Sequence, residues 1–365
     1  MKAVKKPKLI IAALSSRAYV QAAVQAGFDV VAIDAFCDVD TQKIAHQTHQ
    51  VALSEYGFDA KQLLTTLVSL DLSTLTGFCY GAGFEAQPEL LTAIAKYLPV
   101  FGNGEETVRH VKNPQMFQVL CHAFEMATPM TLFKRPRNSI GWLSKVAGAS
   151  GGAHIKALLP LELLPNEALY YQQIVPGIPI SCLFLADGIH AEVIGFSEQW
   201  CAPSVLHPYR YGGAVSHAEV SALCKLQIEA FIRAMTYKLA LRGINSADFI
   251  VDGNRVYALE INPRLSATLD LYSAKRGDFF VAHIAACQAQ LTDWPTVKNS
   301  SRAHHIIYTN DTANVPNDMD WPEWVSDIPQ PNTTIAAGLP LCTVIAEAHT
   351  ARLAKQKVLE RAADL

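Results

Sequence analysis

The chain has 365 residues, of which half are hydrophobic and 17% are charged, so we expect a folded protein with a large core and two or three domains. The net charge of −3 does not provide the basic footprint of a nucleic-acid-binding protein. Eight scattered cysteines without a C-x-x-C pair indicate neither a zinc site nor a disulfide framework, and they predict buried thiols in a reducing cytoplasm. No apolar run is long enough to span a bilayer, so no membrane partner is expected.

Strand and helix patterns alternate along the first third of the chain. Residues 9–14 mimic the apolar part of a signal peptide, but the run is short and Ser-Ser-Arg follows at once, which favours a first strand. Further strands are predicted at 28–33, 77–80 and 100–102, and helices at 19–26, 60–69 and 88–98. This alternation predicts a parallel sheet with helices on both faces.

Ligands of such sheets lie beyond the carboxyl ends of the strands. The loops at those ends therefore supply candidate substrate contacts, namely Ser15, Ser16, Arg17, Asp34, Gly83 and Glu85. Ordinary capping and turn chemistry is the competing explanation for these residues. A dinucleotide site is not supported, because no G-x-G-x-x-G follows the first strand.

A glycine-rich loop follows a predicted helix at 114–127. Lys145 precedes the small-residue segment that contains Gly148, Gly151 and Gly152, and apolar runs flank it on both sides. Glycines let backbone N–H groups approach phosphate oxygens, and the lysine adds a positive charge. The segment lacks the G-K-[ST] ending of a Walker loop, and a flexible hairpin tip is the competing interpretation.

Residues 245–264 predict a β-hairpin around an Asp-Gly-Asn turn. Because side chains alternate along a strand, Glu260 and Asn262 share one face, and Asp248 lies roughly opposite Glu260 on the other strand. Carboxylate and amide oxygens suit a hard cation such as Mg²⁺. A solvated strand face without a metal is the competing interpretation, but Arg264 directly after the strand favours a site.

The order of these features resembles the ATP-grasp superfamily: Lys145, the glycine loop, Q-Q-I-V-P-G at 172–177, Asp248 and E-I-N-P-R at 260–264. The E-x-N-P-R hairpin in this order is the most specific element. The resemblance implies a mixed α/β and α+β architecture. Its three parts are a parallel α/β pre-ATP-grasp domain at 1–112, a two-subdomain ATP-grasp fold at 113–290 and a small C-terminal β/α unit at 291–365.

The resemblance also assigns roles by position. Arg264 lies near the transferred phosphoryl group, and Lys145 holds the nucleotide phosphates, so these two residues are expected to be catalytic. The remaining nucleotide-binding residues would be Gly148, Ser150, Gly151 and Gly152 in a lid, and Gln172, Gln173, Ile174, Val175 and Ser181 in and after the adenine linker. The metal ligands would be Asp248, Glu260 and Asn262, which are expected to hold two Mg²⁺ ions, with Mn²⁺ as a substitute.

Two departures from the family pattern concern the nucleotide site. The family often has an acidic residue in the adenine linker, where this chain has Gln172. It often has a second phosphate-binding lysine near the start of the helix at 114, where this chain reads Lys112-Asn113-Pro114. Either Lys112 supplies that charge from two residues earlier, or the role is lost.

The resemblance implies a ligase that activates a small-molecule carboxylate with ATP as an acyl phosphate, which an amine then attacks. The competing functions are bicarbonate activation, a small-molecule kinase, or a nucleotide-binding relative without turnover. Residues 200–214 contain aromatic side chains together with Arg210 and Gly213, which we nominate as substrate contacts. Members of the superfamily are commonly homodimers, and the substrates cannot be selected from the residues.

Overall fold

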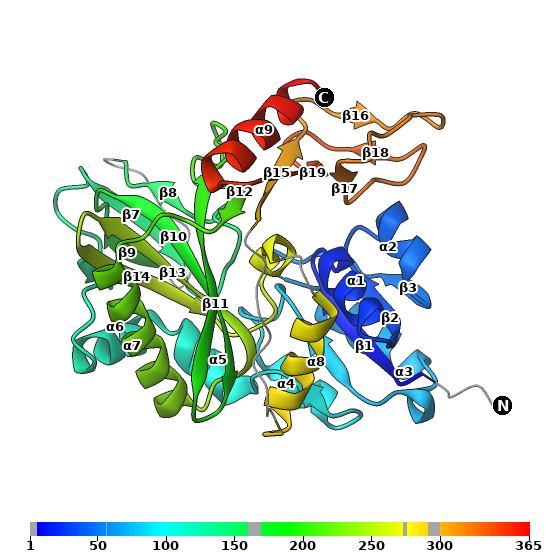
Figure 1. Cartoon of the computed structure of the whole chain (residues 1–365), viewed down its shortest axis with the longest axis horizontal. Coiled ribbons are helices and arrows are strands. Elements are labelled where there is room, and N and C mark those ends of the chain that lie inside the picture. Colours follow the sequence, from blue (N-terminus) through cyan, green and yellow to red (C-terminus); the bar gives the residue numbers. More distant parts are fainter. Residues whose placement is uncertain (1–5, 56, 160–168, 273–275, 291–299) are drawn as a thin grey trace.

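The computed structural model describes residues 6–55, 57–159, 169–272, 276–290 and 300–365. Figure 1 shows a parallel α/β layer at the amino end, a large antiparallel sheet with helices on its outer side, and a carboxyl-terminal piece above both. The helix α8 (Arg276–Cys287) lies between the first two parts.

The amino-terminal sheet has five parallel strands in the order β3-β2-β1-β4-β5. Its strands are β1 (Lys8–Ala13), β2 (Asp29–Asp34), β3 (Gln47–Gln50), β4 (Phe78–Tyr80) and β5 (Val100–Phe101), and its helices include α1 (Arg17–Gln25), α2 (Val39–Ile44), α3 (Ala60–Ser69) and α4 (Glu89–Ala95). The central strand β1 is apolar and buried after Lys8 because α3 and α4 cover one face of the sheet and α1 and α8 the other. The predicted α/β alternation is confirmed.

The large sheet has eight strands in the order β14-β13-β10-β11-β12-β15-β19-β17. They are β10 (Ile178–Asp187), β11 (Ala191–Cys201), β12 (Tyr211–Ser216), β13 (Arg242–Asp252), β14 (Arg255–Asn262), β15 (Ser301–Tyr308), β17 (Val325–Ser326) and β19 (Pro340–Ala348). Strand β10 is buried on both faces. Cys182 and Phe184 pack with α7 (Ala222–Leu239), while Leu183 and Leu185 pack toward α1 and α8.

A smaller sheet of four strands, ordered β6-β9-β7-β8, carries the glycine loop. Its strands are β6 (Thr131–Leu132), β7 (Trp142–Val146), β8 (Lys156–Ala157) and β9 (Leu169–Gln173). The sequence on either side of the Pro176-Gly177 turn predicts two strands. Both exist, but they do not pair with each other. Strand β9 belongs to the small sheet and β10 to the large one, so residues 174–177 form a linker between two sheets.

The carboxyl-terminal strands do not form an independent core. Strand β15 pairs with β12, and β19 pairs with β15, so this part extends the large sheet, and α9 (Ala351–Ala363) covers it. The short strands β16 (Ala313–Asn314) and β18 (Thr334–Ile335) pair beside it. The eight cysteines are all free, although Cys201 is exposed where we expected a buried thiol.

Helix ends follow local sequence signals where a capping side chain is present. The predicted helix at 114–127 is α6 (Pro114–Ala123), which Asn113 caps by accepting hydrogen bonds from two backbone N–H groups. The predicted cap of α1 is different. Ser16 donates its hydroxyl hydrogen bond to Asp34 Oδ2 over 2.6 Å instead of accepting one from its own helix.

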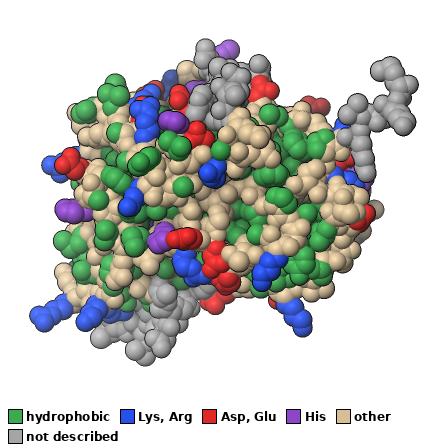
Figure 2. Space-filling model, turned by 90° about the horizontal axis from the view of Figure 1, so that it is seen from below, with side chains coloured by type: hydrophobic (Ala, Val, Ile, Leu, Met, Phe, Trp, Pro, Cys, Tyr) green, Lys and Arg blue, Asp and Glu red, His purple; other side chains and the backbone are tan. Residues whose placement is uncertain are grey.

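The face in Figure 2 carries basic and acidic side chains in small mixed groups between apolar and neutral ones. None of the helices in the described part of the chain is both long and apolar enough to cross a bilayer.

Candidate functional site

The candidate metal ligands lie on the β13–β14 hairpin in the expected register. Asp248 pairs with Glu260, and Ser246 pairs with Asn262. A bulge between Asp248 and Phe249 interrupts the ladder at this point. Bulges re-aim side chains, and here the bulge lies directly beside the candidate carboxylates.

Lys112, at the end of α5 (Glu105–Lys112), connects these side chains. Its Nζ lies 2.8 Å from Glu260 Oε2 and 2.7 Å from Asn262 Oδ1, and its side chain is only 6% exposed. Asn262 in turn donates from Nδ2 to Asp248 Oδ2 over 2.9 Å. Lys112 therefore lies against two of the candidate metal ligands, and its role toward phosphate stays a prediction.

The two carboxylates of this group have opposite pKa shifts. Burial and the neighbouring Glu260 carboxylate raise the pKa of Asp248 to about 6. Burial also acts to raise the pKa of Glu260, but the hydrogen-bonded Lys112 ammonium outweighs it and lowers that pKa to about 2. At neutral pH both groups are ionised, and the lysine offsets only one of the two negative charges.

A buried oxygen with few partners supports a cation at this position. Ser181 faces Asp248 across the β10–β13 ladder, and apart from each other Asp248 Oδ1 and Ser181 Oγ have no hydrogen-bond partner among the described residues. Within the described chain, no three His, Cys, Asp or Glu side chains are grouped to hold a metal, so the candidate set is two carboxylates and one amide. An all-oxygen set of this kind fits Mg²⁺ better than a transition metal.

Lys145 lies on β7 of the small sheet. Its Nζ donates to Gln172 Oε1 over 2.7 Å, and Gln172 Nε2 donates to Thr131 Oγ1 over 3.4 Å. Burial lowers the pKa of Lys145, while the carboxylates of Glu260 and Asp248 act in the opposite direction. Gln172, which replaces an acidic residue of the family pattern, therefore positions this lysine through a neutral acceptor.

The glycine loop is held between two other loops. A Cβ on Gly148 would lie 3.0 Å from Glu85 O and from Ala86 Cα, and a Cβ on Gly152 would lie 2.1 Å from Tyr209 O. Tyr211 N donates to Gly151 O over 2.9 Å. The loop therefore packs against backbone on both sides, which only glycine allows at Gly152, where φ is +75°.

The loop separates two spaces of very different size. On the side of α6 and β14, the cleft lined by Lys112, Gly148 and Glu260 has a free volume of only about 30 Å³. On the side of the amino-terminal domain, a cavity of about 440 Å³ is lined by Ser150 and Lys156, among others. The loop therefore lies low over α6 and β14 and leaves little free space on that side.

His154 borders both spaces, and our sequence reasoning gave it no role. Burial lowers its pKa to about 4, so the imidazole is neutral at physiological pH. The backbone of Ser150, in the glycine loop, acts in the opposite direction on this pKa. The only sequence signal was its place directly after the glycine loop.

Arg264 joins the hairpin to the amino-terminal domain. Its Nε donates to Glu85 Oε1 over 2.7 Å, and both side chains are at most 10% exposed. The other oxygen of Glu85 accepts the backbone N–H groups of Gly83 and Phe84. The structure thus brings together Arg264, Gly83 and Glu85, three candidates that lie far apart in the sequence.

Ser15 and Arg17 lie in a different group, close to the carboxyl-terminal part. Arg17 Nε lies 2.8 Å from Asp327 Oδ1, and its Nη2 lies 3.0 Å from Asp270 Oδ2. The Ser15 hydroxyl donates to the same Asp327 oxygen over 3.3 Å. These side chains line a cavity of about 540 Å³. Asp327 also lines this cavity, although no sequence pattern marked it as a candidate.

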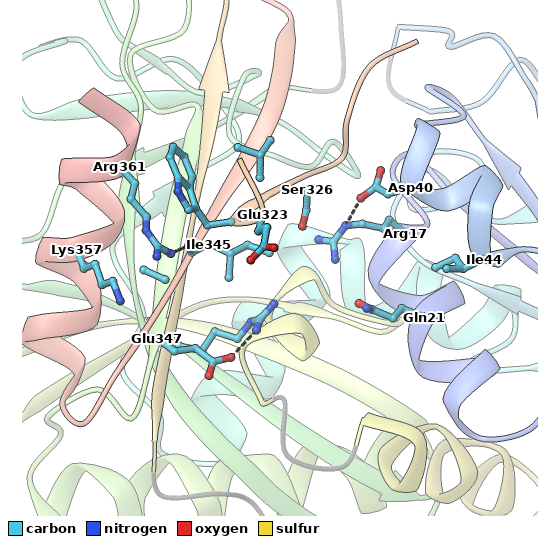
Figure 3. Close-up of a pocket in the computed structure, with 14 residues that line it drawn as sticks. Arg17, Gln21, Asp40, Ile44, Glu323, Ser326, Ile345, Glu347, Lys357 and Arg361 are labelled. Atoms are coloured by element: carbon cyan, nitrogen blue, oxygen red, sulfur yellow. Dashed lines mark hydrogen bonds and ion pairs between the residues drawn. The ribbon is translucent and has the colours of Figure 1, made fainter. Parts of the chain in front are cut away.

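A second cavity, of about 510 Å³, lies on the far side of Arg17. Figure 3 shows Arg17 and Asp40 facing each other from the amino-terminal domain, with Lys357 and Arg361 of α9 across the opening. Arg17 Nε lies 3.8 Å from an Asp40 oxygen. Arg17 therefore forms part of the wall between the two cavities.

Arg210 and Gly213 are placed apart from these groups. The Arg210 guanidinium lies 3.6 Å above the centre of the Tyr308 ring and donates to the carbonyl oxygens of Ala202 and Gly338. Gly213 lies in β12, where a Cβ would be 2.2 Å from His304 O. Their contacts connect strands and loops of the carboxyl-terminal part.

The linker residues lie at the mouth of the small sheet. Backbone N–H groups of Gln173 and Ile174 are engaged by Met130 O and Gly141 O, each over 2.8 Å. Ile174 is 48% exposed, and Val175 is half-buried. An adenine ring would therefore rely on other groups of this segment than these two donors.

Comparison with known proteins agrees with this arrangement. Residues 99–268 match a family model described as an ATP-grasp domain. None of the curated proteins gives a significant match. Pyruvate carboxylase of Rhizobium etli has a TM-score of 0.72 at 14% identity, with 98% of this chain covered, but the chain spans only 39% of that protein.

Two further solved structures are similar over nearly their whole length. The biotin carboxylase domain dimer of Hydrogenobacter thermophilus 2-oxoglutarate carboxylase, in complex with MgADP and bicarbonate, has a TM-score of 0.72 at 10% identity and covers 95% of this chain and 88% of its own. The L-amino acid ligase of Bacillus licheniformis has a TM-score of 0.69 at 12% identity and covers 98% and 97%. At these identities the likeness shows the fold.

Proposed function

Residues 99–268 are an ATP-grasp domain, and from this premise we propose that the chain is an ATP- and Mg²⁺-dependent ligase that joins a carboxylate to an amine. The chain would transfer the γ-phosphoryl group of ATP to the carboxylate, and the amine would then displace phosphate from the acyl phosphate. The similar structures include an amino acid ligase and a carboxylase domain with bound MgADP, which supports this class of chemistry.

One observation carries the proposal. Lys112, Lys145 and Arg264, from three separate elements, all act electrostatically on the Asp248–Glu260 pair of the hairpin. Phosphoryl transfer depends on positioning and on neutralising the charge of the phosphate oxygens. Three cations around one oxygen-rich pair provide that environment, which a merely solvated strand face does not require.

Each cation would have a separate task. Lys145 would bind phosphate oxygens from the floor of the small sheet. Arg264, held in orientation by the buried Glu85 carboxylate, would present its remaining N–H donors to the oxyanion of the transferred group. Lys112 would leave Glu260 and Asn262 and turn to the nucleotide phosphates, because its present partners are the metal-ligand candidates.

Asp248, Glu260 and Asn262 are the residues that would hold Mg²⁺. When bound, the metal supplies charge neutralisation to the terminal phosphates. The glycine loop would exclude water from above, and its backbone N–H groups would contact phosphate oxygens.

The test is ADP release over pairs of carboxylates and amines, in the presence of ATP and Mg²⁺. We expect ADP release only when both substrates are present. Glu260→Ala should lower the rate of ADP release at least about 100-fold, because losing a group that merely supports a metal ligand already costs up to about 100-fold. Glu192→Ala is the matched control, since Glu192 is an exposed glutamate on β11 of the same sheet. Wild-type turnover in Glu260→Ala would refute the metal assignment.

A nucleotide-binding relative without turnover is the second candidate. The observation in its favour is the 30 Å³ cleft, with Lys112 bonded to two of the metal-ligand candidates. This alternative predicts that calorimetry detects MgATP binding while no substrate pair releases ADP. A phosphorylated product that persists without any amine would instead identify a kinase. ADP release that requires bicarbonate would identify bicarbonate activation.

A further inference from the structure

The 540 Å³ cavity has an apolar end and a charged end. It lies between the carboxyl ends of β1 and β2, the short 3-10 helix at Ala267–Leu271, and the carboxyl-terminal strands β15 and β19. Its apolar lining includes Leu14, Phe36, Leu53, Ile306, Tyr308 and Leu341. A cavity of this size fits a small organic molecule, and its apolar walls favour a ligand with a hydrocarbon or aromatic body.

The charged end contains more carboxylates than cations. Arg17 is the guanidinium at this end, and Asp270, Asp327 and Asp40 all lie within 4 Å of it, with Asp40 at 3.8 Å. Figure 3 shows the Arg17–Asp40 pair from the side of the neighbouring cavity. Arg302 Nη2 also lies 3.7 Å from Asp270 Oδ1, but Arg302 is shared with Glu347, so the acids at this end still outnumber the cations.

Asp38 adds a fourth carboxylate, and this one has no cation. It is 5% exposed, and its Oδ2 is buried without a hydrogen-bond partner among the described residues. It precedes α2 but makes no side-chain capping bond to that helix. A buried carboxylate without a partner is costly to a folded protein, so such a group in a cavity wall indicates a missing ligand group.

The electrostatic surroundings of Asp38 agree with a missing cation. Burial, together with the carboxylates of Asp327, Asp34 and Asp40, raises its pKa to about 9 against the opposing effect of Arg17. A ligand carboxylate would meet the same repulsion. A ligand ammonium would lower the repulsion among all of these groups.

The neighbouring polar side chains are already engaged. Gln330 Nε2 donates to Cys37 O over 2.7 Å, and the His304 ring pairs with the Tyr211 hydroxyl over 2.7 Å. Of the polar groups that line this end, the Asp38 carboxylate is therefore the one that offers an unused buried acceptor within the described chain.

We propose that this cavity binds an amine, with its protonated nitrogen at Asp38 and its apolar body against the walls formed by residues such as Leu53 and Leu341. The cavity adjoins the phosphoryl-transfer site, because Tyr19 lines it and donates its hydroxyl to Leu265 O, one residue after Arg264. Assigning this ligand as the acceptor substrate rests on the proposed ligase function, whereas the binding of the cation does not. The cavity would then select an amine that carries an apolar group over a small hydrophilic one.

The experiment is isothermal calorimetry on the full chain with benzylamine as the probe. Benzyl alcohol and benzoate replace the ammonium with a neutral and an anionic group, and ethanolamine removes the apolar body. We expect benzylamine to bind at least about 10-fold more tightly than benzyl alcohol and benzoate, since a hydrogen bond to a charged group contributes about 1.5–3 kcal/mol. It should also bind at least about 10-fold more tightly than ethanolamine, which keeps the ammonium but has no apolar body to bury. Equal binding of benzyl alcohol would overturn the proposal, because a protonated, neutral Asp38 would then be the recognition group.

Two variants locate the binding. Asp38→Asn should weaken benzylamine at least about 10-fold while leaving benzyl alcohol unchanged, and Asp252→Asn at the exposed hairpin turn should change neither. If Asp38→Asn does not fold, Leu341→Trp fills the apolar end without touching the carboxylate and should also weaken benzylamine. Unchanged benzylamine binding in the folded variants would refute the assignment.

A parallel titration with MgATP separates the two proposals. Nucleotide binding without selective benzylamine binding would refute the amine cavity alone. Selective benzylamine binding without nucleotide binding would leave the cavity assignment intact and refute the ligase function.

Discussion

Gly152 should tolerate no side chain, and its neighbour Gly151 provides the matched control. Both residues have left-handed backbone, with φ of +75° and +73°. A Cβ on Gly152 would lie 2.1 Å from the backbone oxygen of Tyr209, whereas a Cβ on Gly151 meets nothing within 4 Å. Alanine at the two positions therefore carries the same backbone strain but differs in the clash.

The magnitudes follow from these contacts. Left-handed backbone costs an alanine about 1–2 kcal/mol, and both variants bear this cost. Gly152→Ala must in addition move the loop away from Tyr209. This displacement breaks the hydrogen bond from Tyr211 N to Gly151 O, which is worth about 0.5–1.5 kcal/mol, and loses packing around it. If the clash raises the free energy of the loop position that contacts Tyr209 by about 1–2 kcal/mol, the population of that position falls about 5- to 30-fold.

The assay is the dissociation constant of MgATP by calorimetry, together with the thermal midpoint of each variant. If the loop in its position against Tyr209 covers the nucleotide, Gly152→Ala should raise the dissociation constant of MgATP about 5- to 30-fold more than Gly151→Ala does. Equal nucleotide affinity for the two variants would refute the reasoning that contact with the Tyr209 backbone holds the loop over the nucleotide.

Three further predictions concern charge. Glu85→Gln should lower the free energy of unfolding by about 3–5 kcal/mol in urea denaturation, because it leaves the buried Arg264 guanidinium without its counter-charge. Mg²⁺ affinity in calorimetry should fall as pH drops from 7 to 5, because the pKa of Asp248 is about 6 and a metal needs the ionised carboxylate. Asp38→Asn should become increasingly stabilising between pH 5 and 8. The folded state of the wild type has a pKa near 9 at Asp38 and retains a proton that the unfolded chain releases near pH 4, so wild-type stability falls by about 1.4 kcal/mol per pH unit in that window.

Each of these has a control and a contrary outcome. Adding Arg264→Met to Glu85→Gln should recover part of the lost stability, since the unpaired charge is gone; an unchanged midpoint for Glu85→Gln alone would contradict the role of the pair. A flat Mg²⁺ affinity between pH 5 and 7 would show that Asp248 does not bind the metal. Asp252→Asn, at an exposed turn, should change the free energy of unfolding by the same amount at each pH between 5 and 8. If the difference between Asp38→Asn and the wild type is also independent of pH, the pKa of Asp38 is not raised.

Elements whose patterns are local could be predicted from the sequence. The parallel strands β1, β2 and β4 are apolar because both faces of their sheet are covered, and the α3 range was predicted to the residue. The hairpin followed from its turn, but the pairing of Asp248 with Glu260 did not, because a bulge between Asp248 and Phe249 shifts the register by one residue from the one that the turn sets. Glu260 and Asn262 share a face through strand alternation alone.

Other features depended on contacts that no local pattern encodes. The sequence predicted two strands around the Pro-Gly turn, but only their partners show that β9 and β10 belong to different sheets. Ser16 looked like a helix cap, and its hydroxyl instead meets Asp34, at the end of the neighbouring strand. Cys201 is exposed although buried thiols were expected, since burial depends on what packs over a strand end.

The sequence by itself determined which residues are candidates for phosphate and metal binding and in what order they occur, because a motif is a matter of spacing along one hairpin or loop. Only the tertiary structure decided which charges meet. Arg264 and Glu85 are 179 residues apart, Lys112 and Glu260 are 148 apart, and Arg17 and Asp327 are 310 apart. Such pairs form because separate domains bury their polar loops against one another, and a buried charge is stable only beside a partner. Asp38 is buried by the same packing and lacks that partner, and no pattern along the chain could have indicated this.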